Sequence, residues 1–246
     1  MMTPARTAII DTPRVTHGGA RDAVRGSDTA TATGTIGPNA VIQLIGPLRD
    51  EHIAERVFAA AGAAEWLVAP PSAMVDERRV VRLHRALREA VPQEQARRLL
   101  TVAGRLTADY ILANRIPLPA RTLLKCLPAP VACRLLVAAI RAHAWTFAGS
   151  ASFVARPGDP TVFTLTGNPL CGGTRNPLCG GTGNPLCAGE RALSPVCAWH
   201  AAVFQRLFED LVSPRSRVVE TACEAIGDRC CRFEIDWRPS PALPHH

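Results

Sequence analysis

Three cysteines and one glutamate near the end of the chain are the side chains best suited to chemistry: Cys197, Glu220, Cys223 and Cys231. Thiolates and carboxylates are ligands that zinc takes in proteins, and four of them fill a tetrahedral site. Spacing alone leaves an alternative open. The four can also be ordinary buried thiols beside an exposed glutamate, because free cysteine is often buried and the set contains no CxxC pair.

The residues around Cys197 predict a helix that begins beside it. Ser194-Pro195 is typical of a helix start, so we expect a helix from there to about Val212. Cys197 would then lie in the first turn, where the helix dipole favours a thiolate.

The other three residues fall in a predicted hairpin. Strands are expected at 217–219 and 231–235, joined around Gly227-Asp228, which would bring Cys223 and Cys231 face to face. Residues three apart in a regular strand point to opposite faces. Glu220 therefore reaches the same ion as Cys223 only if a bulge or turn interrupts the strand between them.

This C-terminal run resembles the 4-vinyl reductase domain family. The matching motifs are Leu207-Phe208, Glu220-Thr221-Ala222-Cys223, Gly227-Asp228 and Cys231-Arg232-Phe233. The resemblance implies a structural zinc on Cys197, Glu220, Cys223 and Cys231. Gly167-Asn168-Pro169-Leu170-Cys171 and Cys197-Ala198-Trp199-His200 are similar to the bacteriochlorophyll 4-vinyl reductase branch, and the likeness extends over about residues 48–237.

One departure from that family is a tandem repeat. Asn-Pro-Leu-Cys occurs three times with an eight-residue period, ending at Cys171, Cys179 and Cys187. Asn before Pro disfavours helix and the glycines favour turns, so we expect a loop over 167–190. The three cysteines match no compact zinc spacing, which favours an exposed or partly buried insertion over a metal site.

Hydrophobic periodicity predicts an α+β fold, with N-terminal helices packed on a small antiparallel sheet that one helix interrupts. Residues 1–38 lack periodicity and are expected to be a flexible extension, followed by one domain over 39–238 and a tail over 239–246. Helices are expected at 48–63, around Val80 to Leu87, around Leu99 to Tyr110 and at 132–144, and two strands after Trp145 that turn at 157–160.

Composition limits the setting of the protein. Nine cysteines without a secretory signal predict a reduced cytoplasmic protein, and the longest apolar stretch, 135–140, is too short to cross a bilayer, so membrane contact would be at most peripheral. A net charge of +7 and five arginines between Arg78 and Arg88 raise the question of nucleic acid. No nucleic-acid-binding motif accompanies them, so a solvated helix face is the better interpretation, with pigment carboxylates or anionic lipid heads as an alternative.

For function, the resemblance implies a tetrapyrrole of bacteriochlorophyll biosynthesis. Vinyl reduction needs a hydride donor, but the chain has no GxGxxG after a strand, no visible flavin site and no ferredoxin cysteine spacing. We therefore expect a protein that holds a magnesium-porphyrin and delivers it to magnesium chelatase or other pigment-synthesis enzymes. A 4-vinyl reductase is the alternative, and a small-molecule sensor domain is a third possibility. The expected ligand-binding residues are His143, which ends an apolar helix, Trp145 beside it, and His200.

Overall fold

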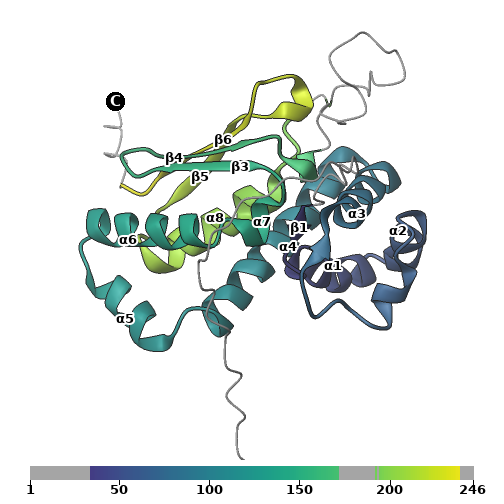
Figure 1. Ribbon diagram of the computed structural model, residues 1–246, viewed down its shortest axis with the longest axis horizontal. Helices are drawn as coiled ribbons and strands as arrows, with labels where there is room; N and C mark the ends of the chain where they lie inside the picture. The colour runs from purple at the N-terminus through teal and green to yellow at the C-terminus, as the bar shows by residue number, and fades with distance from the viewer. Residues whose placement is uncertain (1–33, 172–191, 193, 239–246) are drawn as a thin grey trace, which may run out of the picture. The chain divides into compact units, whose positions relative to one another are not determined.

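The computed structural model describes residues 34–171, 192 and 194–238. Helices fill the first part of the chain and an antiparallel sheet the second (Figure 1). The elements are β1 (Thr35–Ile36), α1 (Asn39–Asp50), α2 (Ala54–Ala60), η1 (Ala64–Leu67), β2 (Val75–Asp76), α3 (Glu77–Ala90), α4 (Gln93–Asn114), α5 (Leu118–Cys126), α6 (Ala129–Ala142), α7 (Trp145–Ala148), β3 (Ser152–Arg156), β4 (Thr161–Thr166), η2 (Pro169–Cys171), α8 (Ala198–Leu211), β5 (Arg217–Ala222), η4 (Glu224–Ile226) and β6 (Cys231–Asp236).

The main sheet has four antiparallel strands in the order β3-β4-β6-β5. Helix α8 enters the chain between β4 and β5 and lies along one face of this sheet, with α4 on its other side (Figure 1). Alternate residues of β4 and β6 are buried, which is the pattern of strands with one covered face. The fold class predicted from the sequence is confirmed.

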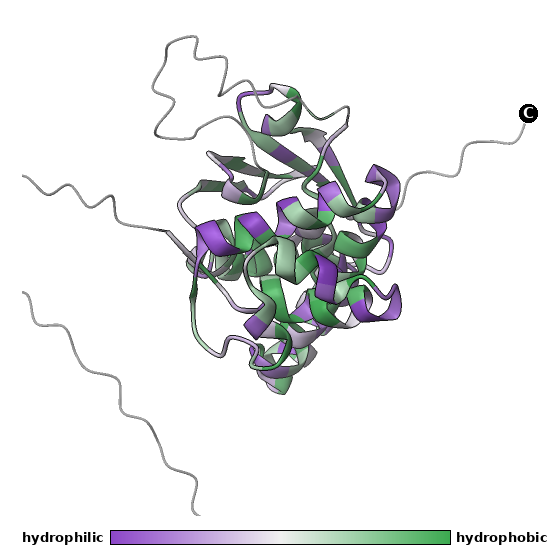
Figure 2. Ribbon diagram, turned by 90° about the vertical axis from the view of Figure 1, so that its right-hand side faces the viewer, coloured by the Kyte–Doolittle hydropathy of each residue, from purple (hydrophilic) through white to green (hydrophobic). Residues whose placement is uncertain are grey.

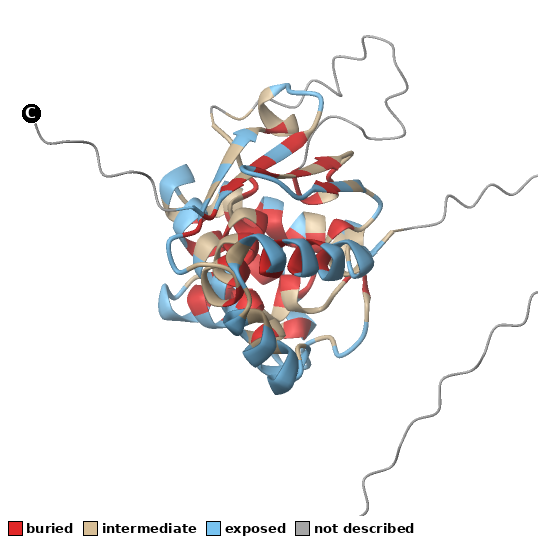
Figure 3. Ribbon diagram, turned by 90° about the vertical axis from the view of Figure 1, so that its left-hand side faces the viewer, coloured by how far each residue is buried: buried red, intermediate tan, exposed pale blue. Residues whose placement is uncertain are grey.

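Aromatic rings fill the space between the sheet and α8. Phe204 of α8 contacts Phe163, Phe233 and Phe147 in edge-to-face geometry, with ring centroids 4.9, 5.4 and 5.6 Å apart. Burial of such rings is among the largest contributions to the stability of a core. The buried residues form the inner layer in Figure 3, and hydrophobic residues mark the inward faces of the helices in Figure 2.

Several predicted elements differ in detail. The helix expected at 48–63 is wrong, because α1 already begins at Asn39 and the chain breaks at His52, whose φ of 57° is left-handed, before α2 begins. The structured part also begins earlier than residue 39, since Thr35 and Ile36 pair with β2. Residues 145–148 form the short helix α7 instead of extended chain.

Candidate metal centre

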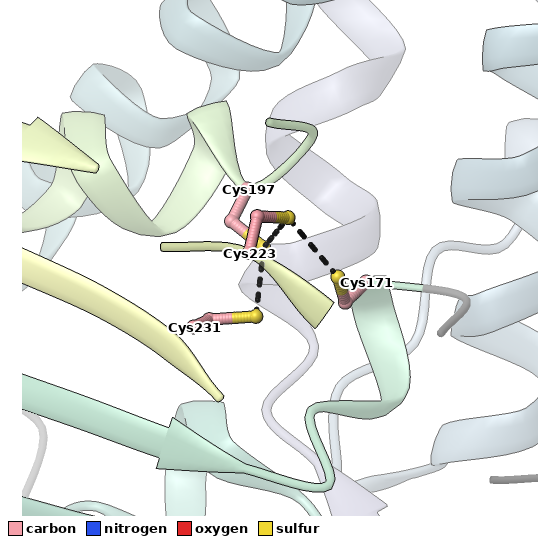
Figure 4. Close-up of side chains that lie close together, drawn as sticks. All are labelled: Cys171, Cys197, Cys223 and Cys231. Atoms are coloured by element: carbon pink, nitrogen blue, oxygen red, sulfur yellow. Dashed lines mark hydrogen bonds between the residues drawn. The ribbon is translucent and has the colours of Figure 1, made fainter. Parts of the chain in front are cut away.

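Four buried thiols meet where the two halves of the sheet and the start of α8 come together. The Sγ atoms of Cys171, Cys197, Cys223 and Cys231 all lie within 4.8 Å of one another (Figure 4). Sγ of Cys223 is 3.4 Å from that of Cys171 and 3.9 Å from that of Cys197, and the Cys197 and Cys231 sulfurs are 3.5 Å apart.

Each thiol is supplied by the end of an element. Cys171 ends η2, Cys197 is the N-cap residue of α8, Cys223 follows β5 and Cys231 begins β6. The predicted interruption of β5 is present, because the pairing register shifts between Glu220 and Ala222. Since Ala222 pairs with Arg232, the residues that follow and precede them bring two sulfurs to the same end of the hairpin.

The geometry fits a tetrahedral metal. Zinc–sulfur bonds of about 2.3 Å place neighbouring sulfurs about 3.8 Å apart in a tetrahedron. The three sulfur–sulfur separations of 3.4, 3.5 and 3.9 Å are close to that spacing without any rearrangement of the backbone. A group of four buried cysteines in this arrangement can hold a metal ion.

Hydrogen-bond donors surround the sulfurs. Asn168 Nδ2 donates to the sulfurs of Cys197 and Cys231 at 3.4 and 3.6 Å, and the backbone N–H of Ala225 donates to Cys171 at 3.1 Å. The Glu224 carboxylate holds Asn168 in place by accepting from its backbone N–H at 2.9 Å. Such donors stabilise thiolates and orient them toward a cation.

The thiols share protons unequally. Hydrogen bonds from Cys171, Cys197 and Cys231 hold the pKa of the Cys223 thiol well below its ordinary value. Hydrogen bonding with Cys171 and the other two sulfurs holds the pKa of Cys197 well above it. A cluster that already favours one thiolate is suited to a cation, because metal binding requires deprotonated sulfur.

Arg88 places a positive charge beside the cluster. Its Nη1 donates to the carbonyl oxygen of Leu170 at 3.2 Å, next to Cys171. Burial lowers the pKa of this guanidinium, whereas the nearby Cys197, Cys171 and Cys223 sulfurs act to raise it. Four thiolates and a divalent cation carry two net negative charges, which a neighbouring arginine partly neutralises.

Glu220 lies beside the thiols as a fifth oxygen donor. Its Oε2 accepts from the backbone N–H of Cys197 at 3.1 Å, and its Oε1 is buried with no hydrogen-bond partner among the described residues. Burial first, and the charge of Cys223 second, raise the pKa of the Glu220 carboxyl to about 9. The structure therefore brings together all four residues proposed from the sequence, and adds Cys171.

The expectation for Cys171 was wrong. We expected the first repeat copy to belong to an exposed or partly buried insertion, but this thiol is 3% exposed and lies in the cluster. The reason is tertiary, because Glu224 binds the backbone N–H groups of Gly167 and Asn168 directly after β4. Cys179 and Cys187 lie outside the described residues.

The three candidate ligand residues are separated by burial. His143 and Trp145 are exposed at the end of α6 and the start of α7, and the Trp145 side chain is 58% exposed. His200 is 1% exposed, with Nε2 3.3 Å from the carbonyl oxygen of Phe147. Burial lowers the pKa of His200 to about 4.

His84 predicts a pH dependence of stability. Its ring is 1% exposed and its Nε2 lies 3.0 Å from the carbonyl oxygen of Ala40. Burial lowers its pKa from 6.5 to about 3, with smaller contributions from the charges of Arg88 and His200. The unfolded chain binds the proton more readily, so stability is full above pH 6.5 and falls as the pH drops toward 3, by about 1.4 kcal/mol per pH unit.

Urea denaturation of wild type and His84→Gln between pH 7.5 and 4.5 checks this expectation. Glutamine can still donate to the Ala40 carbonyl but cannot titrate, so the variant should lose less stability over this range. Equal slopes for the two proteins would contradict the assignment to His84.

No helix in the described part of the chain is long and apolar enough to cross a membrane. Among solved structures, the chain is similar to one titled "Probing the function of heme distortion in the H-NOX family". The TM-score is 0.50 at 11% identity, covering 86% of this chain and 99% of the other. At that identity the likeness concerns the fold alone.

Sequence comparison identifies the family. The 4-vinyl reductase domain matches residues 182–236, which include Cys197, Glu220, Cys223 and Cys231. The bacteriochlorophyll synthase 23 kDa chain of Cereibacter sphaeroides is 46% identical over 203 residues, covering 81% of this chain and 89% of the relative. The protein of the same name from Rhodobacter capsulatus is 41% identical over 206 residues, covering 81% and 86%. The chain belongs to the family of the bacteriochlorophyll synthase 23 kDa chain.

Proposed function

We propose that this protein acts in bacteriochlorophyll biosynthesis by binding a magnesium-porphyrin or divinyl chlorophyllide intermediate and delivering it to a pigment-synthesis enzyme such as magnesium chelatase. The names of the two relatives support the pathway. The observation that supports magnesium-pigment binding by this chain is the state of the His143 ring.

His143 has the hydrogen-bond pattern of a metal-ligating histidine. Its Nδ1 lies 2.9 Å from the carbonyl oxygen of Ala139. A carbonyl can only accept, so Nδ1 carries the proton, and in the neutral ring Nε2 keeps a free lone pair. Magnesium in a porphyrin takes an axial nitrogen, and ligating histidines commonly donate their other N–H to a carbonyl.

The surroundings of His143 suit a flat, anionic pigment. Trp145 is two residues away and offers an exposed aromatic face, while Arg141 is an exposed cation on the last turn of α6. The ring stacks on tryptophan and the guanidinium pairs with a pigment carboxylate. His200 is enclosed by Phe147, Phe204 and Phe233, so we give it a part in the core and leave pigment binding to His143 and Trp145.

In this proposal the metal of the cysteine cluster is zinc and its role is structural. Four protein thiols close the coordination shell, which is typical of structural sites, whereas catalytic zinc keeps a position for water. The unpartnered oxygen of Glu220 makes it the alternative fourth ligand to Cys171.

An absorption titration tests pigment binding. Magnesium-protoporphyrin added to purified protein should show a shifted Soret band, and His143→Gln should bind at least about tenfold more weakly, because the axial nitrogen is lost. His52→Asn is the matched control, since His52 is also exposed and asparagine tolerates its left-handed backbone. Equal binding by wild type and His143→Gln would remove His143 from the site, and no Soret shift with wild type would end the carrier proposal.

The same mixture separates a carrier from the 4-vinyl reductase alternative. With a divinyl pigment and NADPH as the added hydride donor, a carrier binds the pigment and leaves the vinyl group intact. Conversion to the monovinyl pigment by the isolated protein would establish the reductase instead. Preference for a small phenol over any tetrapyrrole would favour the sensor class.

A further inference from the structure

Helices α5 and α6 form an outer layer with unusual exposure. None of the nine residues of α5 is buried, and its Leu118 and Leu123 are 70% and 58% exposed. On α6, Val131 and Leu135 are 40% and 48% exposed, while Cys133, Leu136 and Val137 pack inward. Figure 3 views the molecule from the side on which these two helices lie in Figure 1.

The charge of this layer has one sign. Residues 110–158 contain no aspartate or glutamate, and their Lys and Arg residues are Arg115, Arg121, Lys125, Arg134, Arg141 and Arg156. Arg121 and Lys125 pair with Asp210 of α8, which fixes one side of α5 against the body. Arg134 and Arg141 are exposed on α6 and form no ion pair within the described residues.

Apolar and cationic side chains share one side of α6. Val131, Arg134 and Leu135 are three and four residues apart, and Arg141 lies two turns beyond Arg134, so all four project from the side opposite the buried stripe. We call Leu118, Leu123, Val131, Arg134, Leu135 and Arg141 the α5–α6 face.

We propose that the α5–α6 face docks the protein on an anionic lipid bilayer, as a peripheral contact. Exposed leucines insert among acyl chains near the headgroups, and arginines on the same surface attract anionic headgroups. The charge argues against a second copy of this chain as the occupant, because two such faces would bring like charges together. The aliphatic side chains argue against nucleic acid, which would leave them unsatisfied at a phosphate surface.

Vesicle co-sedimentation of the full chain without pigment tests this inference. Vesicles of phosphatidylcholine with about 30% phosphatidylglycerol should bind at least about tenfold more protein than phosphatidylcholine alone. Arg134→Gln with Arg141→Gln should weaken binding about 25-fold, at about fivefold for each cation near an anionic surface. Leu118→Ser with Leu123→Ser should weaken it on both vesicle types.

Two control variants remove the same chemistry elsewhere. Arg82→Gln with Arg85→Gln takes two exposed charges from α3, and Val68→Ser takes an apolar side chain that is 90% exposed. Both should bind like wild type, and circular dichroism should show every variant folded, because only exposed positions change.

Several outcomes would overturn the inference. They are no binding to the anionic vesicles, equal loss in the α3 variant, or a concentration-dependent dimer of wild type that Leu118→Ser with Leu123→Ser abolishes. The assay contains no pigment, so its result is separate from the test of the carrier proposal.

Discussion

Replacing Cys223 with serine should reduce bound zinc from about one atom per chain to none and lower the thermal midpoint by more than ten degrees. Cys223 is fully buried, and its sulfur contacts those of both Cys171 and Cys197. Structural zinc sites contribute folding free energy directly, and the four ligands come from ends of elements that are far apart in the sequence. Elemental analysis of freshly purified protein and a thermal denaturation curve measure the two effects.

Cys133→Ser is the matched control for that substitution. Cys133 is also buried, but its sulfur lies 3.1 Å from Oγ1 of Thr161, outside the cluster, and a serine hydroxyl can keep that hydrogen bond. The control should retain about one zinc per chain. A Cys223→Ser protein with unchanged zinc content would contradict the metal centre.

The same measurement decides between the two candidate fourth ligands. If Cys171 is the ligand, Cys171→Ser should lower zinc affinity far more than Glu220→Gln, and the reverse order would identify the carboxylate. Both residues approach the cluster from different sides of Cys197, since Asn168 precedes Cys171 and the Glu220 carboxylate binds the Cys197 backbone N–H.

Most of this centre follows from local sequence. The spacing of Glu220, Cys223 and Cys231 around Gly227 predicts a hairpin with a bulge, and the structure contains both. Cys171 does not follow, because its repeat is composed of turn-forming residues and three equivalent cysteines compete for one place. Only the contact of Glu224 with the chain directly after β4 selects the first copy, and that contact joins residues 56 and 57 positions apart.

The fold shows the same division between local and distant causes. Strands β3 and β4 and helices α3 and α6 follow from periodicity, since each has one covered face. Helix α5 was not predicted, because it buries no residue and has no inward stripe for a sequence pattern to reveal. In α3, the pattern predicts a solvated arginine face, but only the structure shows that Arg88 reaches the Leu170 carbonyl beside the thiols.

Gly104 provides the closest approach between α4 and α8. A Cβ atom at this position would collide with the backbone carbonyl oxygen of Trp199 and lie 2.8 Å from Cβ of Ala202. The carbonyl cannot move aside as a flexible side chain can, so the two helices would have to separate. Cys197 precedes Trp199 by two residues, and the displacement would therefore reach the metal centre.

Gly104→Ala should consequently destabilise the protein by about 2 kcal/mol or more and weaken zinc retention, although alanine favours a helix by about 1 kcal/mol over glycine. Gly46→Ala is the matched control, because Gly46 also lies inside a helix, α1, and an added Cβ meets no atom within 4 Å outside its chain neighbours. Pro47 follows it and limits the gain from alanine, so this variant should stay within about 1 kcal/mol of wild type. Urea denaturation gives both free energies, and the rate of zinc transfer to a chelator gives the retention. Wild-type stability in Gly104→Ala would show that α4 and α8 can separate without cost, and faster zinc loss in Gly46→Ala would show that retention does not depend on this helix contact.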